Sequence, residues 1–167
     1  FQGESANSDF IGVNFCSNDA WHASHVKYLH NASNCLSRQQ FRSLVAAKSQ
    51  SSFLGHIFVP KNIVATTAYQ DSKSLLLGET SRVNLKPYLE IFADDVICTH
   101  SATVGNVDEN TLFYLRSRGM SEPAAYLILL QAFTKELVDA CDSSKIKKHV
   151  LSRINYLSDH VFLGGDL

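Results

Sequence analysis

The stretch that decides the fold runs from residue 53 to residue 99 and reads FLGHIFVPKNIVATTAYQDSKSLLLGETSRVNLKPYLEIFADDVICT. Short runs rich in β-branched and aromatic residues recur in it, at 53–59, 63–69, 75–77, 88–92 and 96–99. Turn-forming residues separate these runs, at 60–62, 70–73, 78–80, 86–87 and 93–95. Regular short strands with regular turns are typical of an all-β sandwich, a barrel or a β-solenoid.

The kind of turn favours the solenoid among these three architectures. Hairpin turns of the Asn-Gly or Asp-Gly type, which best signal tight antiparallel pairing, are absent from the sequence. A parallel solenoid needs no hairpins, because each strand pairs with the equivalent strand one coil away. The strand pattern alone leaves the sandwich and the barrel open.

The chain divides near residue 105, where the period of the apolar residues changes from two to about 3.6. We predict a partial β core over residues 6–105, a small helical domain over residues 106–160 and a loose tail over residues 161–167. Residues 1–5 are set aside as a tag remnant or a disordered end, because Phe1-Gln2-Gly3 resembles what a cleaved expression tag leaves behind.

Capping signals divide the helical part into three helices. Asp108 caps the first, which Gly119 closes, and Ser121 caps the second, which has Pro123 in its first turn. The third begins near Ser144. The apolar faces that the spacing predicts are Ala125, Leu129, Ala132, Phe133 and Leu137 on the second helix, and Ile146, Val150, Ile154 and Leu157 on the third.

The region upstream of residue 53 carries a weaker β pattern. Val26 and Tyr28 alternate with polar neighbours, as on a half-buried strand, and His30 extends the alternation. Residues 37–45 fit either a strand or a short helix, and we favour a strand because the segment leads into the β pattern.

The composition excludes several classes of protein. A chain of 167 residues with 45% hydrophobic and 19% charged residues is globular rather than disordered. Fifteen Lys and Arg against sixteen Asp and Glu leave no basic excess for binding nucleic acid or an anionic membrane. The longest apolar run of the C-terminal part, residues 127–130, is far shorter than the ~18 residues of a membrane span. We therefore predict neither nucleic acid nor membrane as a partner.

Cysteine usage favours a reducing compartment. The four cysteines at positions 16, 35, 98 and 141 form no Cys-x-x-Cys pair, and a chain of this size does not need disulfides for stability. We expect free thiols. Loops of the Walker type, Gly-x-Gly-x-x-Gly and Gly-x-Ser-x-Gly are all absent, so the sequence predicts neither a nucleotide site nor a serine hydrolase.

The pair most able to carry chemistry is Cys98 and His100. Residues two apart in a strand point to the same side, with side-chain origins ~7 Å apart. Val96 shares this face, which we expect to point toward a core or an interface rather than open water. A thiolate and an imidazole suit a soft metal, but two ligands do not fill a tetrahedral site, so further ligands must come from elsewhere in the fold or from a second subunit. The alternative is that both residues only pack.

Two other groups of side chains are weaker candidates. Arginine is enriched at interface hot spots, so the end of the first helix is a candidate partner surface, although cations there also suit the helix dipole. Its residues are Phe113, Tyr114, Arg116 and Arg118. His22 and His25 form only a weak His-x-x-His metal motif, because their region does not have a helical pattern.

Four segments in the right order carry a resemblance to a known family. They are residues 86–105, KPYLEIFADDVICTHSATVG; residues 112–119, LFYLRSRG; and, upstream, SRQ at 37–39 and LLLG at 75–78. Over roughly residues 25–157 the chain resembles the SufB/SufD family, the scaffold subunits of the Suf iron–sulfur cluster assembly machinery. It is more similar to SufD, because SufB has Glu-His-Glu-Ala at residues 98–101 and a cysteine in a Gln-Cys-Asp-Ser segment where this chain has residues 69–72. Ser101 stands where the family usually has glycine.

The resemblance implies a right-handed parallel β-helix followed by a helical domain, as the C-terminal part of a longer family member with more coils. It implies a SufB-like partner subunit and a SufC-like ABC ATPase that docks on the helices. The histidine that matches His100 lies at the SufB–SufD interface in the family and helps to build the nascent cluster with a SufB cysteine. Cys98 matches a neighbouring SufD cysteine of less certain role.

We therefore expect a scaffold rather than an enzyme, located in the cytoplasm or in a plastid or other organelle of a eukaryote. Its only cofactor is a transient nascent iron–sulfur cluster shared with the partner, and none is expected in the isolated chain. Alternatives are a SufB-like subunit, or a solenoid interaction module with no metal role. A homodimer through an open end of the solenoid is also considered. A β-helix enzyme acting on polysaccharides is disfavoured, because the adjacent Asp94 and Asp95 would face opposite sides of a strand.

Overall fold

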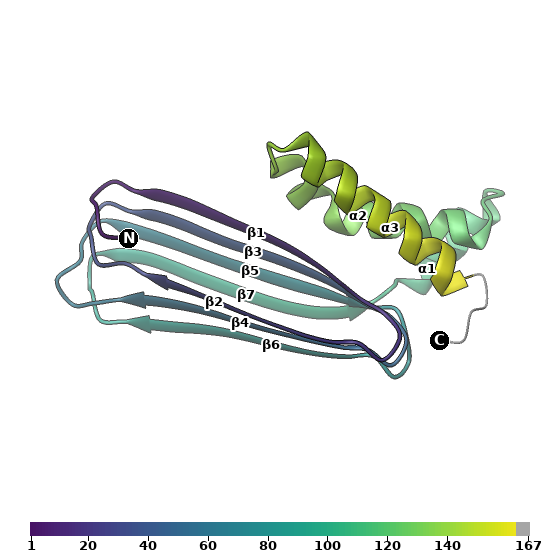
Figure 1. Cartoon of the computed structure of the whole chain (residues 1–167), viewed down its shortest axis with the longest axis horizontal. Coiled ribbons are helices and arrows are strands. Elements are labelled where there is room, and N and C mark those ends of the chain that lie inside the picture. The colour runs from purple at the N-terminus through teal and green to yellow at the C-terminus, as the bar shows by residue number, and fades with distance from the viewer. Residues whose placement is uncertain (163–167) are drawn as a thin grey trace.

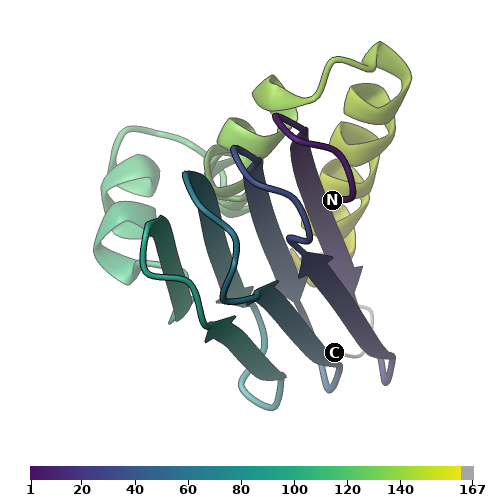
Figure 2. The same ribbon diagram turned by 90° about the vertical axis from the view of Figure 1, so that its left-hand side faces the viewer.

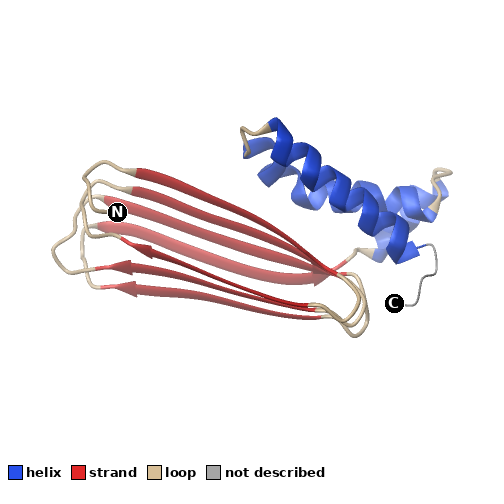
Figure 3. Ribbon diagram, viewed as in Figure 1, coloured by secondary structure: helices blue, strands red, loops and turns tan. Residues whose placement is uncertain are grey.

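The computed structural model describes the backbone of residues 1–162 and the side chains of residues 1–158. Within this range seven strands come first and three helices follow, as the colours of Figure 3 show. The strands are β1 (Asn7–Cys16), β2 (Trp21–Leu29), β3 (Leu36–Val45), β4 (Gln50–Val59), β5 (Thr66–Leu76), β6 (Arg82–Ile91) and β7 (Val96–Asn106). The helices are α1 (Glu109–Ser117), α2 (Glu122–Ala140) and α3 (Ser144–Phe162).

The strands form two parallel sheets, one with the order β1-β3-β5-β7 and one with the order β2-β4-β6. Each strand thus pairs with the second strand after it, so two strands and their connections make one coil (Figures 1 and 2). Asn7 pairs with Leu36 and Leu36 with Thr67, which makes successive coils 29 and 31 residues long. The predicted parallel solenoid followed by a helical region is confirmed.

The corners of the coils repeat the same backbone conformation. Ser5, Asn34 and Ala65 have positive φ angles of 59°, 58° and 50°, and each stands just before a strand of the four-stranded sheet. Asn18 and Ala47 stand at the other corner, before strands of the three-stranded sheet, and have positive φ angles of 60° and 56°. A left-handed residue turns the chain sharply, and its recurrence at equivalent positions gives successive coils the same corner.

The solenoid interior is apolar at one end and polar toward the other. Ile57, Val59, Ile63 and Ala68 form a fully or nearly fully buried cluster at the end farther from the helices. At the other end of the strands, buried Asn14 donates hydrogen bonds to the hydroxyl oxygens of Ser51, at 2.9 Å, and Ser43, at 3.2 Å. A mixed interior of this kind hides the strand pattern from sequence reading, because inward positions are not all apolar.

The sequence-based assignment of two stretches to turns is wrong. Residues 70–73 lie inside β5, and residues 86–87 lie inside β6. Gln70 and Ser72 are buried because they point into the polar interior rather than into a loop. Pro87 is tolerated because β6 is an edge strand of its sheet, where a missing N–H costs no ladder bond on the open side. The 63–69 and 75–77 runs are therefore one strand, apart from their ends.

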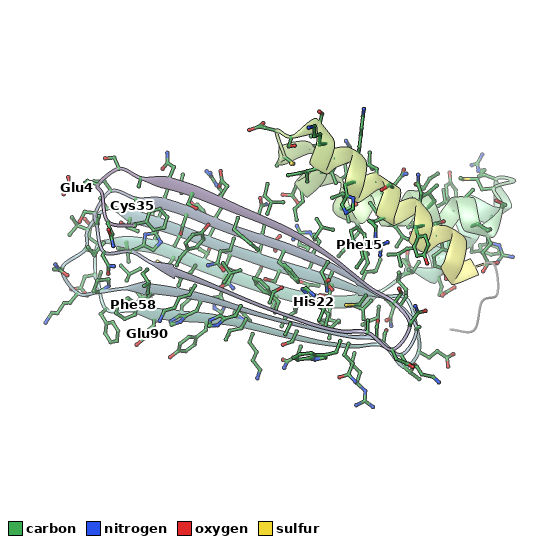
Figure 4. All side chains as sticks on the ribbon, in the orientation of Figure 1. Glu4, Phe15, His22, Cys35, Phe58 and Glu90 are labelled. Atoms are coloured by element: carbon green, nitrogen blue, oxygen red, sulfur yellow. The ribbon has the colours of Figure 1, made fainter. Side chains whose placement is uncertain are left out.

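The helices cover the outward face of the four-stranded sheet near the C-terminal ends of its strands. Leu44 of β3 is fully buried against Leu130 of α2 and Ile154 and Leu157 of α3. Phe15 packs on the same cluster, and Figure 4 shows it on the side of β1 that faces the helices. This cluster is the second core of the molecule and fixes the helices to the solenoid.

The predicted helix ends are confirmed. Asp108 caps α1, with its side chain accepting from the backbone N–H groups of Asn110 and Thr111. Gly119 has a φ of 90° just after α1, and Pro123 lies in the first turn of α2 after its N-cap Ser121. None of the described helices is long and apolar enough to cross a membrane. The predicted tail lies largely outside the described residues.

The predicted apolar faces are correct only in part. On α2 the buried residues are Ala125, Leu130, Thr134 and Leu137, whereas Ala132 is exposed, so the buried face is rotated from the predicted one. On α3, Ile154 and Leu157 are buried but Ile146 is 55% exposed. A helix that is apolar on more than one side does not by itself show which side meets the sheet.

Candidate functional site

The last coil of the solenoid is only half formed. β7 pairs with β5 at the end of the four-stranded sheet, whereas the other sheet ends at β6. After Asn106 the chain leaves the solenoid for α1 instead of making a strand opposite β7 (Figure 1). Within the described chain, one edge of β7 and part of its inward face are therefore open.

Cys98 lies on the inward face of β7, as the alternation of the strand predicts. Its neighbour in register is the buried Ala68 of β5, and it packs with Val96 against the apolar cluster around Ile57. Burial raises the pKa of the Cys98 thiol. The side chain is thus mainly a thiol at neutral pH, and it must lose its proton to bind a metal ion.

His100 follows on the same face but is exposed, because no described strand lies opposite this part of β7. The expectation that this face avoids open water therefore holds for Val96 and Cys98 in the single chain, while His100 is left at the open end. Its neighbour in register is Gln70, which is only 2% exposed. The imidazole thus stands over a buried amide and is accessible from outside.

The outward side of β7 is tied to the helices through a chain of polar contacts. The hydroxyl of Ser101, next to His100, donates to Asp71 at 2.6 Å. Asp71 pairs with Arg42 at 2.7 Å, and Arg42 pairs with Glu136 of α2 at 3.2 Å. Burial by itself would raise the pKa of Asp71, but the Ser101 hydrogen bond and the positive charges of Arg42 and Lys73 hold it below its ordinary value.

The residues predicted as a partner surface lie together at the end of α1. Phe113 is 73% and Tyr114 is 55% exposed, as are other aromatic side chains of the chain such as Trp21, at 71%. The guanidinium of Arg118 lies 5.2 Å from the centre of the Tyr114 ring, and Arg116 pairs with Glu122 at 3.3 Å. All four side chains are thus exposed on α1 or directly after it, and their role as a partner site remains a prediction.

Metal-ligating residues are sparse elsewhere. Across the described residues there is no group of three or more His, Cys, Asp or Glu side chains that could hold a metal ion. His22 points inward and contacts Ser24, whereas His25 is exposed on the other face of β2. The weak His-x-x-His motif is thus split across the strand. Cys98 and His100 offer two donors, which is an incomplete set for a tetrahedral site.

Sequence reasoning missed Gln70 and Asp71, which it assigned to a turn. The signal that identifies them is the length of a coil. Gln39, Gln70 and His100 are 31 and 30 residues apart, and the register pairs each with the next. Once the coil length is known, the residues that neighbour His100 can be found in the sequence.

The comparisons with known proteins agree with one another. The family model described as "SUF system FeS cluster assembly, SufBD core domain" matches residues 1–133. The iron-sulfur cluster assembly protein SufD of Escherichia coli is 41% identical over 125 residues, which cover 75% of this chain and 30% of that protein. The SufBD family protein slr0076 of Synechocystis is 31% identical over 138 residues, 83% of this chain and 30% of that protein.

A plant relative extends the match further along the chain. Protein ABCI7, chloroplastic, of Arabidopsis thaliana is 30% identical over 156 residues, which cover 93% of this chain and 33% of that protein. The chain thus spans about a third of the length of these relatives. A family model over most of the chain, with a parallel solenoid as the fold, leads to one conclusion: the chain belongs to the SufB/SufD family of iron–sulfur cluster assembly proteins, as the SufD-like motifs around Cys98 and His100 indicate.

Proposed function

We propose that the chain is a SufD-like scaffold subunit that holds part of a nascent iron–sulfur cluster at the open end of its solenoid. A SufB-like subunit covers that end and supplies the remaining ligands. A SufC-like ABC ATPase binds the helices, and ATP hydrolysis alters the shared interface. In this assembly the chain is a scaffold and not an enzyme.

The observation that carries the proposal is the half-formed last coil with two soft donors on one face. An unpaired strand edge is a ready template for another chain, since its N–H and C=O groups lack partners. Cys98 and His100 lie on this strand, and iron or sulfide held there would remain short of ligands until a second chain arrived. The incomplete ligand set thus supports a site that is shared between two subunits.

The end of α1 supports the second partner. The exposed Phe113 and Tyr114, together with Arg116 and Arg118, combine aromatic and guanidinium groups of the kind that anchor protein interfaces. α1 also follows β7 directly, with only Val107 and Asp108 between them. A partner that moved α1 would therefore pull on the strand that carries His100.

Two alternatives can be distinguished from the proposal, one by the subunits that the complex contains and the other by its iron content. A SufB-like subunit would pair with a SufD-like protein instead of a SufB-like one. A solenoid module without a metal role would form the same complex but take up no iron at the joint. The proposed reaction setting is the cytoplasm, or the stroma of a plastid, for which the chloroplast relative is the supporting observation.

The test is co-purification with SufB-like and SufC-like proteins, followed by assays of iron and acid-labile sulfide. We predict that His100→Ala lowers the cluster content of the reconstituted complex at least tenfold, since loss of a ligand leaves the site further from a complete set. His25→Ala is the matched control, because His25 is an exposed histidine of the other sheet.

Both variants should leave the circular dichroism spectrum and the yield of the complex unchanged. Equal cluster content in the His100→Ala and native complexes would remove His100 from the site. If the native and the His100→Ala complexes both form normally but neither takes up iron, the interaction module is favoured.

A further inference from the structure

A continuous route of polar contacts crosses the outward face of the four-stranded sheet from α2 to β7. Glu136 of α2 pairs with Arg42 of β3, with 3.2 Å between Oε2 and Nη2. The same Nη2 atom lies 2.7 Å from Oδ2 of Asp71 on β5. The Oδ1 atom of Asp71 accepts a hydrogen bond of 2.6 Å from the hydroxyl of Ser101 on β7. The route therefore ends at the residue next to His100.

The position of Arg42 depends on α2. The Arg42 side chain points outward from β3 yet is only 1% exposed, and Glu136 of α2 is one of its two carboxylate partners. Leu44, two residues further along the same face of β3, is fully buried against Leu130 of α2. A buried cation that loses one partner must be met by another, because an unpaired charge inside a protein is strongly destabilising. If α2 leaves the sheet, the guanidinium must therefore be met by its other carboxylate alone.

The carboxylate of Asp71 is divided between two strands. Its Oδ2 atom faces Arg42 and, at 3.5 Å, the ammonium group of Lys73, whereas its Oδ1 atom accepts from Ser101. A guanidinium binds a carboxylate most strongly when it engages both oxygens. An Arg42 side chain that turned to engage both oxygens of Asp71 would displace the Ser101 hydroxyl from Oδ1.

The contact at Ser101 matters to β7 because this strand has β5 as its only neighbour within the described chain. Thr99 and Thr103 carry the nearest hydroxyls on the same outward face of β7, and neither has a hydrogen-bond partner among the residues that the structure describes. The bond from Ser101 to Asp71 is therefore the outward side-chain tie that adds to the backbone pairing of β7 with β5.

We propose that Arg42 and Asp71 act as a switch between α2 and β7. With α2 seated on the sheet, Glu136 shares the guanidinium, and Asp71 holds Ser101 so that β7 stays fixed beside β5. When α2 is displaced, Arg42 engages both oxygens of Asp71, and β7 is released at Ser101. Asp71 is thus a positioning residue for the strand that bears His100. That a partner displaces α2 and that His100 holds a cluster rest on the proposed function, whereas the coupling of α2 to β7 does not.

The experiment is a double-mutant cycle on this chain, with no metal and no partner added. Glu136→Gln removes the charge on α2 and imitates displacement of the helix at this one contact. Ser101→Ala removes the last step of the route, and a third variant combines the two changes. Asp139→Asn is the matched control on α2, because Asp139 pairs with Lys135 of the same helix. Thr103→Ala is the matched control on β7.

Residue-resolved amide hydrogen exchange measures how often β7 separates from β5. We expect the amides of residues 99–103 that bond to β5 to exchange roughly three- to tenfold faster in Ser101→Ala, the loss of one exposed hydrogen bond to a charged group. Glu136→Gln alone should accelerate the same amides by about twofold or more, because Arg42 then turns to both oxygens of Asp71. Added to Ser101→Ala, it should change nothing further. Ser101→Thr, which keeps a hydroxyl, and both controls should match the native chain.

Two results would overturn the proposal. One is exchange at native rates in β7 of Glu136→Gln. The other is an acceleration by Glu136→Gln that is equally large with and without the Ser101 hydroxyl, since the effect would then not pass through it. The amides of β3 are the internal reference, and their protection shows that each variant is folded. Because no metal takes part, a failed exchange result would leave the cluster assay of the proposed function unaffected, and a failed cluster assay would leave the coupling intact.

Discussion

Arg42 is a single residue on which several elements depend. Its side chain is 1% exposed, and its charge is met by Asp71 on β5 and Glu136 on α2. The guanidinium also donates to the backbone oxygens of Phe41 and Asp71. Lysine, with one compact ammonium group, could not reach these separate acceptors in one plane. A buried charge is tolerated only when it is paired in this way.

The pairing makes the stability of the chain depend on pH in a defined direction. The pKa of Asp71 lies below its ordinary value, so the folded state favours the ionised carboxylate. This stabilisation is fully present above the unfolded pKa of about 3.9 and is lost as the pH falls through the folded value. We predict that Asp71→Asn lowers the free energy of unfolding at pH 7, and that its difference from the native chain shrinks below about pH 4.

Urea unfolding between pH 2 and pH 7 measures this difference. Asp9→Asn is the matched control, because Asp9 also faces outward on the same sheet and pairs with an arginine, Arg38, at 3.3 Å. That pair is about half exposed, so its loss should change the free energy of unfolding by no more than about 1 kcal/mol. A difference for Asp71→Asn that stays constant down to pH 2 would show that the carboxylate is not held ionised by the fold.

For single residues, the sequence predicted the shared face of Cys98 and His100 but not which residues of other coils lie near them. Cys98 and His100 could be placed on one face because alternation along a strand is local. Gln70 and Arg42 could not be connected to them, since they lie one and two coils away in the chain. Their proximity depends on the register between strands, which no short motif records.

At the scale of secondary-structure elements, α2 and α3 pack on the four-stranded sheet through the apolar cluster around Leu44. Leu130 of α2 is fully buried among Leu44, Ile154 and Leu157, so it links α2 both to the sheet and to α3. We predict that Leu130→Ala lowers the free energy of unfolding by about 2–5 kcal/mol, the range for large-to-small changes in a core. Ile128→Ala is the control on the same helix, because Ile128 is 42% exposed.

Limited proteolysis and chemical unfolding measure the effect. Leu130→Ala should expose the connections between the helices to cleavage before the solenoid is cut, whereas Ile128→Ala should behave as the native chain. Cleavage that begins within the strands of both variants would contradict the view that this cluster seats the helices.

Element by element, the helices were easier to predict than the strands. Capping residues such as Asp108 and Gly119 act within a few positions of the chain, so their signals are local. The interruption predicted at residues 70–73 was wrong, because polar residues that point into a polar interior look like a turn in the sequence. β1 falls within the predicted β core of residues 6–105 but was not predicted as a separate strand, since its inward residues include Gly12 and Asn14 beside Phe10.

At the scale of the whole molecule, β7 is one of four edge strands of the described chain, together with β1, β2 and β6. Central strands such as β3 have a neighbour on both edges, whereas β7 has only β5 within the described chain. We predict that alternate backbone amides of β7, those that point away from β5, exchange with deuterium quickly in the chain alone. Binding of a SufB-like subunit should slow them by about tenfold or more, because strand pairing protects amides.

Hydrogen–deuterium exchange followed by mass spectrometry checks this, with the peptide of β3 as an internal reference that stays protected throughout. A SufB-like protein that binds without slowing exchange in β7 would place the joint between the two subunits elsewhere on the surface.

The repeating coil has a consequence for how such molecules change over generations. Because Asn34 and Ala65 turn the chain in the same way at equivalent corners, a coil begins and ends in the same backbone state. A duplicated or deleted genetic segment that encodes one full coil, of 29 to 31 residues here, would rejoin without disturbing the strands on either side. A solenoid of this kind can thus be lengthened or shortened by whole coils without changing the half coil that bears His100 or the helices that follow it.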